Sequence, residues 1–315
     1  MKKIVVLILF SFVSIGVIVS QTDSQLSQYM FNPSIYNPAA AGENEMMEIS
    51  WQHRIQWVGI PNAGQSSFYN VNSPVNLFSN QHGIGLQIVN ENIGLFSNLD
   101  FHFQYAFKKA LSGGILSIGA SLGFLDIGFK GDSVHFPTIG EYYESNDPLI
   151  PTTSVSGIGF DVGLGVWYSN TKGYAGFSYA HLNQPVINWG ENLAYKQVGT
   201  LYLTGGYNWI LNDPKYIIKP SLLFKSDLNS YQVDISAFLE YNSKYWGGLS
   251  YRFQDAVVLF GGINAIAGLI IGYSYDLPVS QIIRGSSGSH EFLIAYNFDI
   301  KLNKAKHKHK SIRIL

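Results

Sequence analysis

The chain has 315 residues, of which 13% are charged and 15% are aromatic, and its formal net charge is −1. Ordinary soluble domains carry about 25% charged residues, so much of this surface faces something other than water. The length suits one large domain with a sizeable core. The sequence has no cysteine, which excludes a disulfide framework and a thiolate site and says nothing about the compartment.

The first 20 residues have the pattern of a secretory signal peptide. Lys2 and Lys3 form the basic start, residues 4–19 are apolar, and Ser20 is a small residue that suits cleavage before Gln21. An uncleaved anchor helix is the alternative. No cysteine follows the apolar run, which excludes a lipoprotein. We expect the mature chain to be exported.

Residues 21–44 form a polar, aromatic lead-in segment. It contains two Asn-Pro steps, Asn32-Pro33 and Asn37-Pro38. Each proline removes a backbone donor and biases the residue before it away from helix. The pattern disfavours a regular helix or a central strand, and it predicts an extended segment docked onto something larger.

Residues 45–300 repeat a two-residue period. No apolar run here approaches the roughly 18 residues that a transmembrane helix needs, so a closed barrel is the remaining way to satisfy the backbone in lipid. We predict an all-β fold, a transmembrane antiparallel β-barrel of about 14 strands. The segments lie near residues 46–56, 66–74, 83–91, 98–108, 114–129, 157–169, 174–183, 200–211, 216–226, 231–241, 245–253, 256–265, 268–277 and 289–299.

Connection lengths predict the orientation of this barrel. If the N-terminus starts in the periplasm, the connections after even-numbered strands are short turns, at residues 109–113, 170–173, 212–215 and 242–244. Those after odd-numbered strands include the long loops 131–156, 184–199 and 278–288, which would lie outside the cell. This is the outer-membrane pattern. The same parity predicts a basic periplasmic tail over residues 301–315, either solvated or docked on an acidic partner.

We expect several aromatic and charged residues to lie on the barrel wall. We expect Trp57, Trp167, Tyr168, Trp209 and Trp246 to form interfacial girdles. Arg54 and Gln56 share one face of the first strand, with Trp57 on the other. Pairing of Arg54 with a lumen carboxylate such as Asp100 or Asp234 is a further expectation.

No motif supports an enzyme. Gly119-Ala120-Ser121-Leu122-Gly123 matches a hydrolase nucleophile elbow, but that pattern requires a strand-to-helix turn and its flanks are strand-like. His307 and His309 lie among lysines, which oppose a metal cation. We expect no cofactor and no metal site. Histidine spacing selects no partner for Ser121 among His53, His82, His102, His135, His181 and His290.

One motif lies within residues 25–64. Its residues are Gln28, Tyr29, Phe31, Asn32, Pro33, Tyr36, Asn37, Pro38, Ala39, Gly42, Arg54, Gln56 and Trp57. This motif resembles the opening signature of the PorP/SprF family of outer-membrane proteins of the type IX secretion system and its associated gliding machinery. We interpret the motif residues as structural or partner-binding, and residues 21–44 would plug the lumen or dock a partner.

The resemblance implies a non-enzymatic barrel that binds the C-terminal sorting domain of secreted proteins and helps to secrete or anchor them at the cell surface. Its implied partners are those proteins, other secretion components including periplasmic ring proteins, and outer-membrane lipid, with no nucleic acid. A porin-like channel or transporter for small molecules is the alternative. A barrel lipase is a third class, tested by Ser121→Ala with no expected effect.

Overall fold

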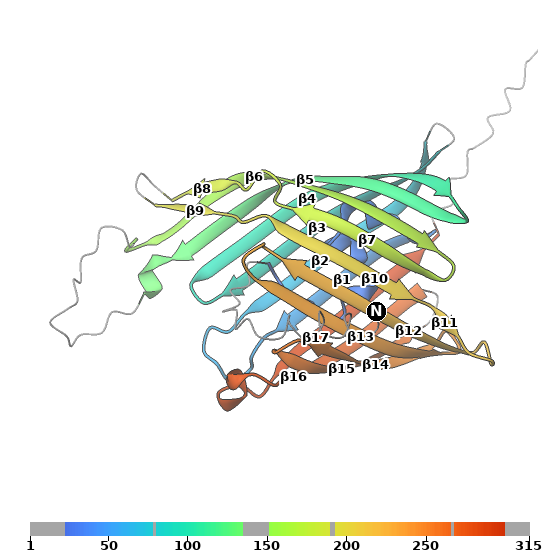
Figure 1. Ribbon diagram of the computed structural model, residues 1–315. Helices are drawn as coiled ribbons and strands as arrows, with labels where there is room; N and C mark the ends of the chain where they lie inside the picture. The colour runs from blue at the N-terminus through green and yellow to red at the C-terminus, as the bar shows by residue number, and fades with distance from the viewer. Residues whose placement is uncertain (1–22, 78–79, 135–150, 190–192, 266–267, 300–315) are drawn as a thin grey trace, which may run out of the picture.

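The computed structural model describes residues 23–77, 80–134, 151–189, 193–265 and 268–299. They form a barrel of fourteen antiparallel strands (Figure 1), which confirms the predicted fold class. The predicted signal peptide and basic tail lie outside the described residues. The barrel strands are β1 (Met47–Ile55), β2 (Gln65–Leu77), β3 (Asn80–Ile93), β4 (Phe96–Leu111), β5 (Gly114–Lys130), β6 (Ser154–Asn170), β7 (Gly173–Ala180), β10 (Thr200–Tyr207), β12 (Tyr216–Ser226), β13 (Tyr231–Tyr241), β14 (Tyr245–Arg252), β15 (Ala256–Asn264), β16 (Leu269–Pro278) and β17 (Ser289–Phe298).

Each strand pairs with the next along the chain, and the last closes onto the first. β17 pairs with β1 from Met47 opposite Phe298 to Ile55 opposite His290. The short strand β11 (Trp209–Ile210) adds to β12 beside the end of β10. Closure gives the backbone of β1 and β17 ladder partners on both sides, as a wall in lipid requires. Among the described residues, no helix is long and apolar enough to cross a membrane.

The two faces of the wall differ in the way that the two-residue period predicts. Lumen-facing side chains are polar and buried, such as Gln52, Gln104 and Ser274. Outward-facing ones are apolar and exposed, such as Phe103 at 50% and Ile118 at 57%. A soluble domain would reverse this arrangement, whereas a membrane barrel with a polar interior requires it.

The girdle prediction is wrong for two tryptophans. Trp167 and Trp246 are buried and face the lumen. A glycine on a neighbouring strand makes room for each indole, because a Cβ at Gly176 would overlap Trp167 and one at Gly262 would overlap Trp246. Sequence position near a strand end does not reveal this facing. Trp209, by contrast, is 60% exposed.

The two ends of the barrel differ in their connections. We call them the long-loop end, which holds the connections after β1, β5, β7 and β16, and the short-turn end. The connection between β7 and β10 carries an additional hairpin at the long-loop end, which the sequence did not predict. Trp189 Nε1 in it donates to the Ile127 carbonyl at 2.8 Å, so it covers part of the wall. The elements of these connections are η4 (Gly131–Ser133), β8 (Val186–Asn188), β9 (Ala194–Lys196) and η6 (Gln281–Arg284).

Candidate functional site

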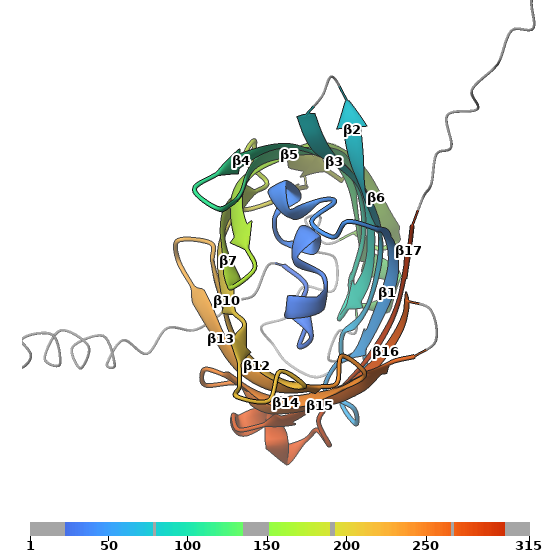
Figure 2. The same ribbon diagram turned by 90° about the vertical axis from the view of Figure 1, so that its right-hand side faces the viewer.

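Residues 23–44, here called the lumen segment, lie inside the barrel (Figure 2). They form three single 3-10 turns, η1 (Tyr29–Phe31), η2 (Pro33–Ile35) and η3 (Pro38–Ala40). Pro33 and Pro38 begin η2 and η3, where a missing N–H costs nothing. The Asn37 side chain accepts a hydrogen bond from the Ala39 N–H at 3.0 Å and caps η3. The Asn-Pro steps therefore fold as cap and first residue of short turns.

The beginning of the lumen segment is bound by a buried carboxylate. Glu291 on β17 accepts hydrogen bonds from the backbone N–H groups of Ser27 at 2.7 Å and Gln28 at 2.9 Å. The Ser27 hydroxyl donates to Asp276 at 2.7 Å and accepts from Arg54 at 2.9 Å. Charged groups of the wall thus satisfy backbone donors that would otherwise be buried without partners.

Two arginines hold these carboxylates in place. Arg54 Nη2 lies 2.7 Å from Asp276 Oδ2, and Arg252 lies 3.0 Å from Asp276 and 2.8 Å from Asp234. All four side chains are nearly inaccessible to solvent. With Glu291, these residues form what we call the charged cluster. Removing one member of such a buried set leaves a charge without a partner, which is strongly destabilising.

Arg54 pairs with lumen carboxylates, as expected, but the two carboxylates named for it were wrong. Its carboxylates are Asp276 and Glu291, the latter at 3.6 Å, rather than Asp100 or Asp234. Arg54 stands opposite Glu291 where β1 pairs with β17, so barrel closure brings them together. Asp234 pairs with Arg252 instead. Sequence alone does not fix which carboxylates of distant strands share the lumen with Arg54.

Amide side chains surround the first Asn-Pro step. Asn32 donates to the Ser50 hydroxyl at 2.7 Å and accepts from Asn70 at 2.5 Å. Ser34 donates to the same Asn32 oxygen at 3.2 Å, and Gln104 donates to the Ser34 carbonyl at 2.8 Å. Three strands thus supply partners to η2. The network is buried, so each amide that lost its partner would cost free energy.

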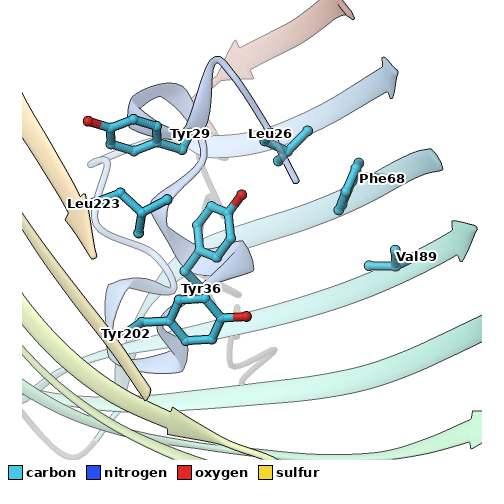
Figure 3. Close-up of a cluster of buried hydrophobic side chains, with 7 residues drawn as sticks. All are labelled: Leu26, Tyr29, Tyr36, Phe68, Val89, Tyr202 and Leu223. Atoms are coloured by element: carbon cyan, nitrogen blue, oxygen red, sulfur yellow. The ribbon is translucent and has the colours of Figure 1, made fainter. Parts of the chain in front are cut away.

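Aromatic side chains fill the space between segment and wall (Figure 3). Tyr36 lies beside Tyr202 with ring centroids 5.2 Å apart. Phe31 lies 4.3 Å from the Trp246 ring and 5.4 Å from the Phe238 ring. These contacts place apolar area against apolar area within a polar lumen. The cluster drawn in the figure comprises Leu26, Tyr29, Tyr36, Phe68, Val89, Tyr202 and Leu223.

The end of the lumen segment rests on glycines. A Cβ at Gly83 would overlap the Ala41 carbonyl, one at Gly119 would overlap Ala39, and one at Gly165 would overlap the Asn37 amide. We call Gly83, Gly119 and Gly165 the glycine floor. The backbone of the segment approaches the strands closely because these residues have no side chain.

Two further contacts fix this end of the segment. Asn37 Nδ2 donates to the Val166 carbonyl at 3.0 Å and to the Phe177 carbonyl at 3.2 Å. Gly42 has a φ of +61°, which glycine tolerates, and its carbonyl accepts from Lys108 at 2.8 Å. Asn37 and Gly42 of the signature are therefore tied directly to the wall.

The first described residue of the segment, Asp23, lies near the long-loop end. Its carboxylate is 3.4 Å from His181 Nε2 and accepts a hydrogen bond from the Tyr202 hydroxyl. His181 Nδ1 lies 3.0 Å from Asp161, which is also 2.8 Å from His102 Nε2. A chain of alternating acids and histidines thus ties Asp23 to β6 and β4.

These neighbours shift two ionisation equilibria. Burial acts to raise the pKa of Asp23, but His181, through its charge and hydrogen bond, and Lys225 outweigh burial and lower this pKa below its usual range. Burial acts to lower the pKa of His181, but Asp23 and Asp161 raise it well above 6.5. The two charged forms therefore stabilise each other.

A cavity of about 90 Å³ remains between the lumen segment and strands β2 to β7 and β10. Its lining includes Asp100, His102, Asp161 and Ser121. Ser121 lies within β5 and not at a strand-to-helix turn, and no hydrogen bond joins its hydroxyl to a histidine in the described part of the chain. Within the same ranges, no group of three His, Asp or Glu residues could hold a metal ion.

The structure brings most of the predicted signature residues together. Arg54 contacts the segment through Ser27, and Gln56 accepts from Arg54 Nε at 3.4 Å. Trp57 lies in the connection after β1, apart from the segment. The other signature residues belong to the segment itself: Gln28, Tyr29, Phe31, Asn32, Pro33, Tyr36, Asn37, Pro38, Ala39 and Gly42.

Other residues of the site were missed by sequence reasoning. They include Asp23, which lies on no strand, and Glu291 on β17. The signal that could have found Glu291 is its position as a polar residue on the strand face that the two-residue period assigns to the lumen. Position alone gives no pairing among them. The remaining missed residues are Lys108, Asp161, His181, Lys225, Arg252 and Asp276.

Comparisons with known proteins give one family match and several distant structural likenesses. The family model described as "Type IX secretion system membrane protein PorP/SprF" matches residues 18–296. No curated protein matches the sequence significantly. The Ralstonia pickettii toluene transporter TbuX is 14% identical, with 84% of this chain and 92% of that chain covered and a TM-score of 0.48.

Two other solved barrels are similar at the same level. A Pseudomonas aeruginosa FadL homologue is 10% identical over 84% of this chain and 93% of that chain, with a TM-score of 0.47. The translocator domain of the autotransporter NalP from Neisseria meningitidis is 13% identical over 80% and 88%, with a TM-score of 0.41. Likenesses this distant carry no argument about what this chain does.

Proposed function

Because the chain belongs to the PorP/SprF family of type IX secretion system membrane proteins, we propose that it is a non-enzymatic outer-membrane barrel that binds the C-terminal sorting domain of secreted proteins. It helps to secrete these proteins or to anchor them at the cell surface, and it contacts periplasmic components of the secretion and gliding machinery. The lumen segment serves as a plug.

One observation carries this proposal: the lumen is occupied by a segment that buried hydrogen bonds, ion pairs and close backbone packing hold against the wall. Backbone donors of the segment meet Glu291, and glycines of the wall accommodate its backbone. A buried charged cluster is costly to assemble and costly to break, so it suits a structural seal better than a gate that opens in each transport cycle. A sealed barrel acts through its surface, which favours protein binding over conduction.

The long-loop end is the surface that we assign to partner binding. We assign this end to the outside of the cell, because outer-membrane barrels have short periplasmic turns and longer extracellular loops. The β8–β9 hairpin there packs on β5 and β6, the two strands that flank residues 135–150 in the chain. Residues 135–150 of that loop lie outside the described residues.

Loop shortening tests this proposal. One variant replaces residues 135–150 with a short Gly-Ser linker, and a second replaces residues 186–196. The control replaces residues 227–230, a short connection at the same end. Retention of a reporter fused to a sorting domain is measured on whole cells, with heat-modifiable gel migration as the test of folding. We expect the first two variants to fold and to lose retention. Full retention in both would contradict the binding role.

A further inference from the structure

We propose that a pocket on the outward face of the barrel, at the long-loop end, binds the phosphorylated headgroup of an outer-leaflet lipid. The pocket has a volume of about 400 Å³ and lies beneath the connection between β1 and β2. We call it the rim pocket. Ile55, Trp57 and Ile60 give it apolar walls, and Lys130 from the end of β5 gives it one positive charge.

Strand alternation shows that the rim pocket faces away from the lumen. Arg54 is buried in the lumen, so its neighbour Ile55 points outward. Gln65 stands opposite Asn92 in the β2–β3 pairing, and both are exposed while their neighbour Ser66 is buried. Lys130 has the same parity on β5 as Phe124, which is exposed on the outward face. The pocket therefore opens where the wall meets the headgroup layer.

The chemistry of the lining suits an anion. Lys130 is the charged residue among the described lining residues, and these include no carboxylate. A lysine ammonium binds phosphate as a point charge. The amide side chains of Asn62, Gln65 and Asn92 also line the pocket and can donate hydrogen bonds. A headgroup phosphate would meet the ammonium and amides, while its acyl chains continue along the apolar wall.

The connection above the pocket is held in a strained shape. Trp57 has a φ of +48°, which is rare for a bulky residue. The Trp57 N–H donates to Ser289 Oγ at 3.0 Å, and Val58 exchanges two backbone hydrogen bonds of 2.8 Å with Ser287 and Gly288. These bonds fix the backbone over the pocket before any ligand binds. Strained, over-determined backbone of this kind is found at ligand clamps.

This inference goes beyond the proposed function and does not depend on cargo binding. It rests on the placement of the long-loop end in the outer leaflet. It also gives Trp57, the signature residue that lies apart from the lumen segment, a place in a site. A bound lipid would fix the depth and tilt of the barrel in the membrane.

Native mass spectrometry of the full-length protein in detergent tests the rim pocket. The protein is titrated with lipid A, a glycolipid carrying two phosphates, and with the same lipid after removal of its phosphates. Lys130→Gln removes the charge and Lys130→Arg keeps it. Lys172→Gln, in the β6–β7 turn at the short-turn end, is the matched control. A final arm adds excess inorganic phosphate to the lipid A complex.

We expect wild type, Lys130→Arg and Lys172→Gln each to bind one molecule of lipid A more tightly than any further lipid A molecules. Lys130→Gln should weaken this site about tenfold, because it loses a charge-assisted hydrogen bond. Equal affinity for the dephosphorylated lipid, or unchanged binding by Lys130→Gln, would overturn the proposal. Displacement of lipid A by inorganic phosphate would also overturn it, since the site would then select a free anion.

Discussion

The two halves of the lumen segment are held by different kinds of force. At residues 27–28, the backbone is bound by Glu291 and a set of buried ion pairs. At residues 37–42, the backbone lies close against the glycine floor, and Asn37 and Lys108 add hydrogen bonds. Ion pairs of the wall dominate the first half, and close approach of backbone to glycine dominates the second.

Because of this difference, opposite kinds of substitution should weaken the contacts of the two halves with the wall. The charged half is disrupted by removing a group, because the partner is then left buried and unpaired. The floor is disrupted by adding a group, because a new Cβ meets backbone that cannot move aside.

The largest effect is expected for Arg252→Met in the charged half. It leaves Asp234 and Asp276 with fewer partners, at a cost of about 3–5 kcal/mol in the free energy of unfolding. Urea unfolding in detergent micelles, followed by tryptophan fluorescence, measures this change. Lys219→Met is the control, because the Lys219–Glu240 pair is partly exposed and worth about 1 kcal/mol or less. An equal decrease in the free energy of unfolding for both variants would show that the charged cluster contributes no more than a partly exposed ion pair.

An added methyl group in the glycine floor should come next. Gly119→Ala places a Cβ against Ala39 and should cost about 1–3 kcal/mol while displacing η3. The chain has no cysteine, so Ala40→Cys provides a single thiol whose labelling rate reports that displacement. Gly247→Ala is the control, because its Cβ would meet only ordinary van der Waals contacts. Equal labelling rates for Ala40→Cys combined with Gly119→Ala and with Gly247→Ala would contradict the claim that the glycine floor positions η3.

The contact of Asp23 with His181 is separate from those at residues 27–28 and 37–42, and a pH titration tests it. The pKa of His181 is raised in the folded protein, so its contribution is complete below pH 6.5 and is lost as the pH rises through the folded value. The pKa of Asp23 is lowered, so its contribution is complete above its ordinary pKa of 3.8 and is lost as the pH falls through the folded value. Residue 23 should be held best between these limits.

Labelling of a Ser24→Cys thiol, relative to the same thiol in the unfolded protein, follows this titration. We expect the normalised rate to rise at alkaline pH, and His181→Gln to remove that rise. A rate that is flat across the alkaline range in the unmutated background would show that the ion pair does not hold the segment.

The smallest effect is expected for Tyr29→Phe. The Tyr29 hydroxyl hydrogen bonds with Ser221 at 3.0 Å and accepts from Ser236 at 3.2 Å, while its ring stays in the apolar cluster. Loss of these bonds should lower the free energy of unfolding by about 1 kcal/mol. The same urea titration measures it. A loss as large as that of Arg252→Met would place the hydroxyl at the centre of the seal.

Local periodicity was enough to predict the wall. The alternation in residues 99–107 appears in β4 as buried Gln104 and exposed Phe103, because each side chain is placed by its own strand. The Asn-Pro steps likewise gave an irregular segment, since proline acts on its own backbone and on the residue before it.

Pairings across the lumen could not be predicted in the same way. Arg54 and Asp276 are separated by 222 residues, and their contact depends on closure and on strand register. The space that the Trp167 indole fills depends on Gly176 of the next strand. The β8–β9 hairpin is too short for its period to be read. These features depend on contacts between residues that are distant in the sequence, so the pattern of neighbouring residues does not predict them.

The central claim is that the lumen segment seals the barrel, and planar-bilayer conductance tests it most directly. Purified wild type is compared with a variant lacking residues 23–42 that retains heat-modifiable gel migration. We expect no steady conductance for wild type and an open, steady channel for the variant. Steady conductance of wild type, at the level of the variant, would contradict the seal and favour a porin-like channel.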